Sequence, residues 1–272
     1  MLLASWRLVR ELLGGVDVAV EVVDVRDPIS TRSVRFERMC GELGVSLVVV
    51  LNKADLIPKG VGLGWVRYFK VYEGLDAVLV SARERLGTLR FRGLVKEKVR
   101  EALGGGGVGV VGVFGVPKVG KSTLINVLKG RHSATTSPYP GTPGYTRRAQ
   151  LFKVRGGFYV LDTPGIIPVE EGVESIIRMN PIDKIPNPVQ TAVELIKKVL
   201  QHNPKAFQTT YGIETQNPPE ILKELAIKRG WIHKKDREPI LHEAAKKIIK
   251  DYLDGEIKYY VKPPKQPKTQ HP

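Results

Sequence analysis

The chain has 272 residues, 42% of them hydrophobic, which excludes wholesale disorder and allows one core of ordinary domain size plus a smaller second one. The formal net charge of +15 and the isoelectric point of about 9.8 favour polyanionic partners, nucleic acid more than an acidic membrane surface. The single cysteine, Cys40, excludes an intramolecular disulfide, and no stretch approaches the roughly 20 uncharged apolar residues of a membrane span, so we expect a cytoplasmic protein without membrane contact.

The first 172 residues alternate short apolar runs with segments of helical length. Residues 1–15 carry charges among apolar residues, which suits an amphipathic helix. The runs rich in β-branched residues indicate buried strands and lie at 18–25, 46–51, 77–80, 108–114, 151–154 and 158–161. The predicted helices lie at 34–43, 65–73, 94–103 and 122–129. This alternation predicts an α/β fold class with a doubly wound, mostly parallel sheet, in a domain over residues 1–172.

Beyond residue 172 the strand pattern ends. Amphipathic segments at 189–201, 218–228 and 238–253 predict a smaller helical domain over residues 173–261. Residues 262–272 combine prolines and lysines without a large apolar side chain, which predicts a disordered tail.

Two groups of basic residues are candidates for RNA contact. The first, between residues 83 and 100, suits phosphate binding, although a solvated helix surface explains it equally well; it comprises Arg83, Arg85, Arg90, Arg92, Lys96, Lys98 and Arg100. The second places lysine pairs beside rings that suit stacking on exposed bases, although core packing explains at least half of the rings. Its members are Lys197, Lys198, Lys228, Arg229, Lys234, Lys235, Lys246 and Lys247, with Trp231, Tyr252, Tyr259 and Tyr260.

Two short motifs in the first third of the chain are typical of guanine recognition. Asn52, Lys53 and Asp55 belong to N-K-A-D, directly after the run at 46–51. The Asp55 carboxylate can accept two hydrogen bonds from the guanine N1–H and exocyclic amine, which adenine does not offer, so ATP is disfavoured. Asn52 would bond the base or brace the phosphate loop, and the Lys53 stem would cover the base plane. Ser81 and Ala82 belong to S-A-R after the next strand, where the Ala82 N–H would recognise the guanine carbonyl.

A glycine-rich loop follows the run at 108–114 and precedes a predicted helix. It matches G-x-x-x-x-G-K-[ST], in which backbone N–H groups wrap around phosphates without Cβ clashes and a helix N-terminus complements their charge. Lys121 should reach the β- and γ-phosphates, and Ser122 should ligate Mg²⁺. The predicted nucleotide contacts are Gly115, Val116, Pro117, Lys118, Val119, Gly120, Lys121, Ser122 and Thr123.

The remaining predicted contacts of Mg²⁺ and the γ-phosphate follow the phosphate loop. Asp162 ends the strand at 158–161 within D-T-P-G and would hold Mg²⁺ through water, while the Gly165 N–H would meet the γ-phosphate. Residues 137–148 offer two threonines for the same ion, Thr142 and Thr146, and the spacing to the next strand favours Thr146. We therefore predict three metal ligands, Ser122, Thr146 and Asp162, and three catalytic groups, Lys121, Thr146 and Gly165.

The order of these motifs is permuted. In conventional GTPases the phosphate loop comes first and the base-reading motifs come last, whereas here N-K-A-D and S-A-R precede the phosphate loop and D-T-P-G. The chain resembles the circularly permuted YlqF/YawG-type GTPases, and the residues D-V-R-D-P at 24–28 and G-E-I-K-Y-Y-V-K-P-P at 255–264 look like two further segments of that family. The resemblance implies a GTPase that assembles the large ribosomal subunit, binds GTP or GDP with Mg²⁺, and attaches to rRNA of that subunit or its precursor when GTP is bound. We expect a monomer off the ribosome.

Two departures from common GTPase patterns affect the expected chemistry. Ile166 stands where many GTPases have a water-positioning glutamine, so the resemblance implies slow intrinsic hydrolysis stimulated by a partner. Lys118 stands where the family usually has an asparagine associated with potassium, so we expect hydrolysis to depend little on K⁺. A nucleotide-regulated RNA-binding protein with negligible hydrolysis is the alternative, and an ATP-using kinase is disfavoured by Asp55.

Overall fold

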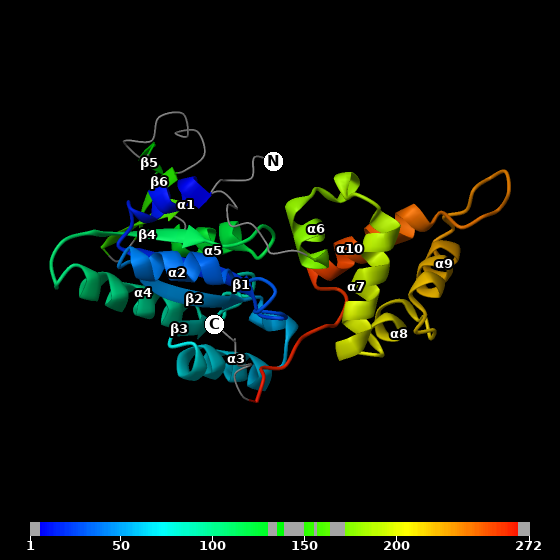
Figure 1. The fold of residues 1–272 in the computed structure, drawn as a ribbon, viewed down its shortest axis with the longest axis horizontal. Helices are drawn as coiled ribbons and strands as arrows, with labels where there is room; N and C mark the ends of the chain where they lie inside the picture. The colour runs from blue at the N-terminus through cyan, green and yellow to red at the C-terminus, as the bar shows by residue number, and fades with distance from the viewer. Residues whose placement is uncertain (1–5, 130–134, 139–149, 155–156, 164–171, 266–272) are drawn as a thin grey trace. The chain divides into compact units, whose positions relative to one another are not determined.

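The structure, a computed structural model, describes residues 6–129, 135–138, 150–154, 157–163 and 172–265 (Figure 1). The chain divides into two compact units, one within residues 2–169 and the other within residues 170–261, and the residues from Lys262 onward belong to the first. Each unit has its own cluster of buried hydrophobic side chains, so each has a core by itself. We call them the sheet unit and the helical unit.

The sheet unit contains a seven-stranded sheet in the order β3-β2-β1-β4-β7-β6-β5. Parallel pairing joins β1, β2, β3, β4 and β7, whereas β6 runs antiparallel to β7 and β5 antiparallel to β6. This confirms the prediction of an α/β fold with a mostly parallel sheet. The strands are β1 (Val18–Asp24), β2 (Ser46–Asn52), β3 (Asp76–Leu79), β4 (Gly109–Phe114), β5 (Thr135–Pro138), β6 (Gln150–Val154) and β7 (Phe158–Asp162).

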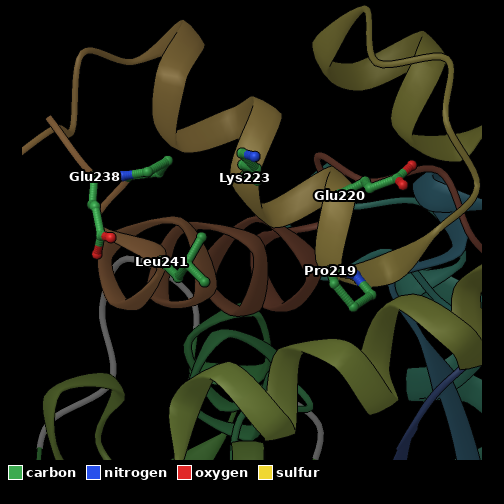
Figure 2. Close-up of a pocket in the computed structure, with 6 residues that line it drawn as sticks. Pro219, Glu220, Lys223, Glu238 and Leu241 are labelled. Atoms are coloured by element: carbon green, nitrogen blue, oxygen red, sulfur yellow. The ribbon is translucent and has the colours of Figure 1, made fainter.

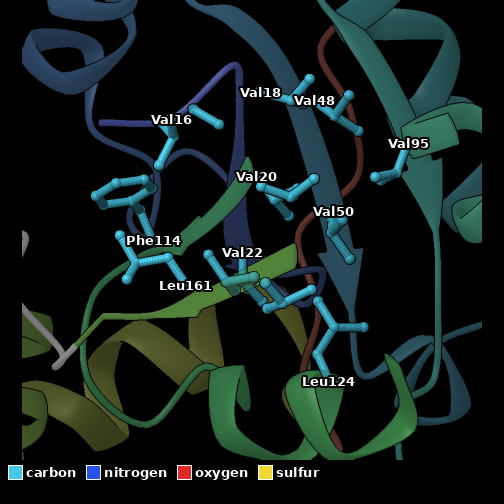
Figure 3. Close-up of a cluster of buried hydrophobic side chains, with 14 of the residues drawn as sticks. Val16, Val18, Val20, Val22, Val48, Val50, Val95, Phe114, Leu124 and Leu161 are labelled. Atoms are coloured by element: carbon cyan, nitrogen blue, oxygen red, sulfur yellow. The ribbon is translucent and has the colours of Figure 1, made fainter. Parts of the chain in front are cut away.

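The central strand β1 shows why the sheet forms. All seven of its residues are buried, and five of them are valine or alanine, as a parallel strand covered on both faces requires. Glu21 is the exception in its middle, and its carboxylate accepts a hydrogen bond of 2.7 Å from the Ser33 N–H at the start of the next helix. Figure 3 shows Val18, Val20 and Val22 of this strand among the core side chains of its neighbours.

Helices connect the parallel strands and pack on the sheet. Helix α2 begins at the cap Ser33, whose side chain accepts from the Phe36 N–H, and α4 contacts β1 to β4. Pro263, beyond the helical unit, lies against Gly64 of α3. The helices of this unit are α1 (Trp6–Leu13), α2 (Val34–Glu42), α3 (Lys59–Tyr72), α4 (Thr88–Ala102) and α5 (Lys121–Lys129), with a short 3₁₀ helix at Ala54–Leu56.

The helical unit is built around α7 and α10, which pack against each other and against α9. A buried ion cluster lies inside it: Glu174 accepts hydrogen bonds from Arg178 Nε at 2.6 Å, from Lys198 Nζ at 2.8 Å and from the Tyr252 hydroxyl. Its elements are α6 (Val173–Met179), a 3₁₀ helix at Ile182–Lys184, α7 (Pro188–His202), α8 (Ala206–Tyr211), α9 (Pro218–Lys228) and α10 (Leu241–Asp254). In the described part of the chain, no helix is long and apolar enough to cross a membrane.

Several boundaries differ from those predicted. Helix α3 begins at Lys59 and α4 at Thr88, each six residues earlier than expected from the apolar pattern. The first turns of α3 contain three glycines, and Gly62 packs closely on Leu79 of β3, so tertiary contact overrides a low helix propensity there. Strand β5 at Thr135–Pro138, and helices α6 and α8, were not predicted.

Candidate functional site

The parallel strands bring the predicted motifs to one edge of the sheet. Asp24 pairs with Asn52 in register, Val113 pairs with Asp162, and Leu51 pairs with Leu79, so β1, β2, β3, β4 and β7 all end at the same edge. Strands β2 and β3 lie on one side of β1, whereas β4 and the strands after it lie on the other side, so the strand order switches between β1 and β4. The phosphate loop follows β4. In open α/β sheets a ligand crevice lies at such a switch point.

The phosphate loop, residues 115–120, has a backbone that only glycine accommodates at two positions. Gly115 has a φ of +143°, and a Cβ there would lie 2.5 Å from the Val22 carbonyl oxygen of β1. Gly120 has a φ of +98°, and a Cβ there would collide with the Asn52 side-chain amide. These glycines therefore let the loop approach β1 and β2 closely.

Lys121, the first residue of α5, has a buried ammonium group. Its Nζ donates to the carbonyl oxygens of Gly115 at 2.8 Å and Val116 at 3.0 Å, and its residue exposure is 7%. Burial lowers the pKa of Lys121 to about 8, while the charge of Asp162 opposes that change. A phosphate placed at this loop would supply the anion that a buried ammonium needs.

The two predicted metal ligands in the described part of the chain lie on adjacent elements. Ser122 and Thr123 are exposed in the first turn of α5, and Asp162 ends β7 beside β4. Burial raises the pKa of Asp162, and the charges of Lys129 and Lys121 oppose it. The neighbouring Thr163 hydroxyl donates to the Val113 carbonyl at 2.5 Å, which holds the end of β7 against β4.

Asn52 joins the phosphate loop to the base-reading loop. Its Nδ2 donates to the Val119 carbonyl at 2.9 Å, and its Oδ1 accepts from the Ala82 N–H at 3.0 Å. The amide is buried, so both bonds are made away from water. Of the two roles considered for Asn52, bracing the phosphate loop is the one that this geometry provides.

A hydrogen bond between Ser81 of S-A-R and Asp55 of N-K-A-D joins the two base-reading motifs. The Ser81 hydroxyl donates to Asp55 Oδ1 at 2.5 Å and accepts from the Glu84 N–H at 3.1 Å. Asp55 is exposed, so its carboxylate is accessible to a base, and the hydrogen bond from the buried Ser81 hydroxyl orients that carboxylate. The Ala82 N–H, predicted to bind the guanine carbonyl, donates to Asn52 here, so a bound base would have to share or replace that acceptor.

Some predicted positions are outside the described residues or have an altered setting. Thr142, Thr146, Gly165 and Ile166 lie outside the described ranges. Lys118 is described, exposed and in the left-handed region with a φ of +64°. Its effect on the potassium dependence of hydrolysis stays a prediction.

A buried ion pair beside the site was missed by sequence reasoning. Asp24 of the D-V-R-D-P segment binds Arg26 and also Lys53 of N-K-A-D, with Oδ2 at 2.8 Å from Arg26 Nη2 and 3.0 Å from Lys53 Nζ. Arg26 is 1% exposed. The available signal was the segment itself, which had a resemblance but no assigned role.

Some of the basic and aromatic residues proposed for RNA contact are instead engaged in contacts within the chain. Arg92 Nη2 donates to the Val127 and Leu128 carbonyls at the end of α5, and Lys98 Nζ binds Asp76 at 2.8 Å and Glu101 at 2.9 Å. In the helical unit the rings of Tyr252 and Tyr259 are each only 1% exposed. Those two rings, half of the four, belong to a core, as the core-packing interpretation expected, so they are not available for stacking on RNA. The remaining exposed members of the first group are Arg83, Arg85, Arg90, Lys96 and Arg100.

The helical unit has pockets of a different character. One of them has a volume of about 440 Å³ and lies between α9 and the start of α10, lined by Pro219, Glu220, Lys223, Glu238, Pro239 and Leu241. Figure 2 labels five of these residues, all except Pro239. Two carboxylates and one ammonium surround the pocket. That balance does not suit a polyphosphate, so this pocket is a poorer candidate for phosphate binding than the sheet edge.

Comparison with known proteins adds family evidence to this geometry. Residues 110–222 match the family of 50S ribosome-binding GTPases. The chain is 32% identical over 256 residues to an uncharacterised GTP-binding protein of Methanocaldococcus jannaschii, covering 93% of this chain and 66% of that relative. It is 28% identical over 286 residues to nucleolar GTP-binding protein 2 of Cryptococcus neoformans var. grubii, covering 97% of this chain but 39% of that one.

A solved structure shares the fold. GNP-bound YlqF from T. maritima superposes with a TM-score of 0.63 at 24% identity, over 94% of this chain and 96% of that chain. The GDP-bound form of the same protein gives a TM-score of 0.62 over 96% of this chain. The family match begins just before the phosphate loop, so N-K-A-D and S-A-R precede it in the chain.

Proposed function

This chain belongs to the circularly permuted YlqF/YawG-type GTPase family, and on that premise we propose that it binds and hydrolyses GTP as an assembly factor of the large ribosomal subunit. The main support for nucleotide binding is the pair of hydrogen bonds of the Asn52 amide, which join Val119 of the phosphate loop to Ala82 of S-A-R. A single side chain thereby ties the phosphate-binding and base-reading loops together at one sheet edge.

Base selection would come from Asp55. Its exposed carboxylate, oriented by Ser81, would accept from the guanine N1–H and exocyclic amine, and adenine would leave it unpaired. The Lys53 stem would cover the base plane. These contacts favour guanine over adenine nucleotides.

The phosphates and Mg²⁺ would be held by α5 and β7. Backbone N–H groups of residues 115–120 and the N-terminus of α5 would bind the phosphates, with Lys121 moving its ammonium from two carbonyls to phosphate oxygens. Ser122 and Asp162 offer the hydroxyl and carboxylate oxygens that Mg²⁺ prefers. The ion would neutralise charge on the β- and γ-phosphates. Thr146 and Gly165 stay predicted contacts of the γ-phosphate.

Attachment to the ribosomal subunit would use the basic surface. The net charge of +15 favours an RNA partner, and Arg83, Arg85 and Arg90 are exposed immediately after the base-reading loop. The description of the matched family as 50S ribosome-binding GTPases agrees with a role in the large subunit. A cytoplasmic location and a monomeric state off the ribosome stay predictions.

Two measurements test this proposal. GDP and ADP titrations should show a strong preference for GDP, and Asp55→Asn should shift the preference to xanthosine diphosphate, because an amide can donate to the carbonyl that replaces the guanine amine. Asp183→Asn, at an exposed carboxylate of the helical unit, is the matched control. Equal affinity for ADP and GDP would contradict the assignment.

The second measurement is sedimentation with 50S-type and 30S-type subunits in GDP and in a non-hydrolysable GTP analogue. Analogue-dependent migration with the large subunit supports the assembly role, and binding to neither subunit contradicts it. The alternative, an RNA-binding protein with negligible hydrolysis, is favoured by Ile166. Single-turnover hydrolysis with and without the large subunit separates the two, since only the GTPase releases phosphate.

A further inference from the structure

The D-V-R-D-P segment, residues 24–28, lies beside N-K-A-D in the sheet. Asp24 ends β1 and is the register partner of Asn52, and the Val25 N–H donates to the Asn52 carbonyl at 2.9 Å. The position of the Asp24 carboxylate is therefore fixed relative to Lys53 by two neighbouring strands. Its side chain is 1% exposed.

The Asp24 carboxylate binds two cations. Oδ1 accepts from the Arg26 N–H at 3.2 Å and from Arg26 Nε at 3.0 Å, while Oδ2 accepts from Arg26 Nη2 at 2.8 Å and pairs with Lys53 Nζ at 3.0 Å. Arg26 alone already gives this buried charge a fork-shaped partner. The additional contact therefore acts on Lys53, whose side chain is 18% exposed at the edge of the site.

The loop after β1 keeps this carboxylate in place. The Asp24 N–H donates to Thr31 Oγ1 at 3.0 Å, and that hydroxyl donates to the Asp27 carbonyl at 2.9 Å. The Ser30 hydroxyl donates to Asp27 Oδ2 at 2.7 Å. The loop is thus closed by its own short polar side chains, and Asp24 is held before any ligand arrives.

Lys53 needs such an anchor. Its backbone is in the left-handed region with a φ of +68°, which sets the direction of the side chain, but the four methylenes of a lysine rotate freely when its ammonium is unbound. A contact between these methylenes and a base requires that freedom to be removed. An ion pair formed in advance removes it without cost at the moment of binding.

We propose that Asp24 and Arg26 are positioning residues for base recognition, holding the Lys53 stem across the plane of the bound guanine. This inference rests on the proposed GTP binding and assigns a role to the D-V-R-D-P segment. Asp24 contacts no nucleotide atom in this arrangement and acts through Lys53, and Arg26 acts through Asp24.

The test compares a ligand that has a base with one that has none. GDP and inorganic tripolyphosphate are titrated calorimetrically, with Mg²⁺, into the full chain and into Asp24→Asn, Lys53→Met and the double variant. Each single change is expected to weaken GDP about tenfold and tripolyphosphate less than twofold. The double variant should bind GDP no more weakly than Lys53→Met, because both changes break one pair. Asp183→Asn, the same chemical change at an exposed carboxylate of the helical unit, is the control and should bind both ligands as the unaltered chain does.

Three results would overturn the inference. They are equal losses for tripolyphosphate and GDP, which indicate a structural role; losses that add to about a hundredfold in the double variant; and unchanged GDP affinity in Asp24→Asn. If Asp24→Asn does not fold, Lys53→Met decides alone: it keeps the apolar stem and leaves Asp24 with Arg26, so GDP affinity equal to that of the unaltered chain overturns the inference. Absence of GDP binding by the unaltered chain would instead overturn the proposed function and, with it, this inference.

Discussion

Replacing Asn52 by alanine tests the connection between the two loops. The change removes the donor to the Val119 carbonyl and the acceptor from the Ala82 N–H. Both backbone groups belong to buried residues, with exposures of 0% and 4%. Alanine leaves both backbone groups without their hydrogen-bond partner.

The expected loss follows from the cost of unpaired buried groups. A buried donor or acceptor without a partner costs about 1–3 kcal/mol, so two of them should lower the free energy of unfolding of the sheet unit by roughly 2 to 6 kcal/mol. GDP affinity should fall as well, because the phosphate loop and the S-A-R loop would no longer be held at a fixed separation. The two effects have a common cause.

The assay is urea unfolding, followed by fluorescence in a Trp231→Phe background so that Trp6 and Trp65 of the sheet unit report. Asn203→Ala, followed by circular dichroism in the unaltered background, is the chemically matched control. Asn203 also donates to a carbonyl, that of Lys258 at 2.8 Å, and accepts from the Lys205 N–H at 3.2 Å, but both bonds are exposed. Water can replace them, so the control should lose less than about 1 kcal/mol.

The reasoning would be refuted by an Asn52→Ala chain that loses no more stability than Asn203→Ala. That result would mean that water enters between the loops, and that the amide does not set their separation. A stability loss without any change in GDP affinity would limit Asn52 to a role in folding.

Three further predictions concern other parts of the chain. Burial alone would raise the pKa of Glu174, but its two cationic partners lower it from 4.5 to about 2. The helical unit should therefore lose about 3 kcal/mol of unfolding free energy as the pH falls from 4.5 to 2. Glu174→Gln should flatten that pH dependence in acid unfolding curves. Gly115→Ala should destabilise the sheet unit by more than about 2 kcal/mol in urea, because its Cβ would meet backbone at a φ of +143°, whereas Gly93→Ala in α4, which has open space, should not destabilise it. Burial, with the charges of Glu21 and Glu37, raises the pKa of Cys40 to about 12, so only about one thiol in ten thousand is ionised at pH 8. Iodoacetamide should therefore react with Cys40 at an appreciable rate only after unfolding. Rapid labelling of the folded chain would contradict this.

The sequence predicted the sheet and the position of the phosphate loop well, because these features depend on local patterns. Strands β1, β2 and β7 were placed within one residue at each end, since continuous β-branched runs are typical of strands buried on both faces. The G-x-x-x-x-G-K-[ST] spacing that includes Gly115 and Gly120 has few explanations other than a phosphate loop. The permuted order was visible in the sequence itself.

The sequence left contacts between distant segments undecided, and for Asn52 it offered two roles without choosing between them. Asn52 is 67 residues from Val119 and 30 from Ala82, and only the register of parallel strands brings all three together. The internal pairing of Arg92 and Lys98 was hidden for the same reason, because a basic residue in a helix has the same local pattern whether it faces RNA or a neighbouring carbonyl.

The amino-acid sequence by itself thus determined the fold class, the family resemblance and the identity of the motif residues, since each of these is written in short-range periodicity and in the residue types that phosphate and guanine require. Tertiary structure alone decided that Asn52 braces two loops and that Asp24 anchors Lys53. The physical reason is that such contacts depend on which strands are neighbours and where they end, and the distance along the chain carries no information about either.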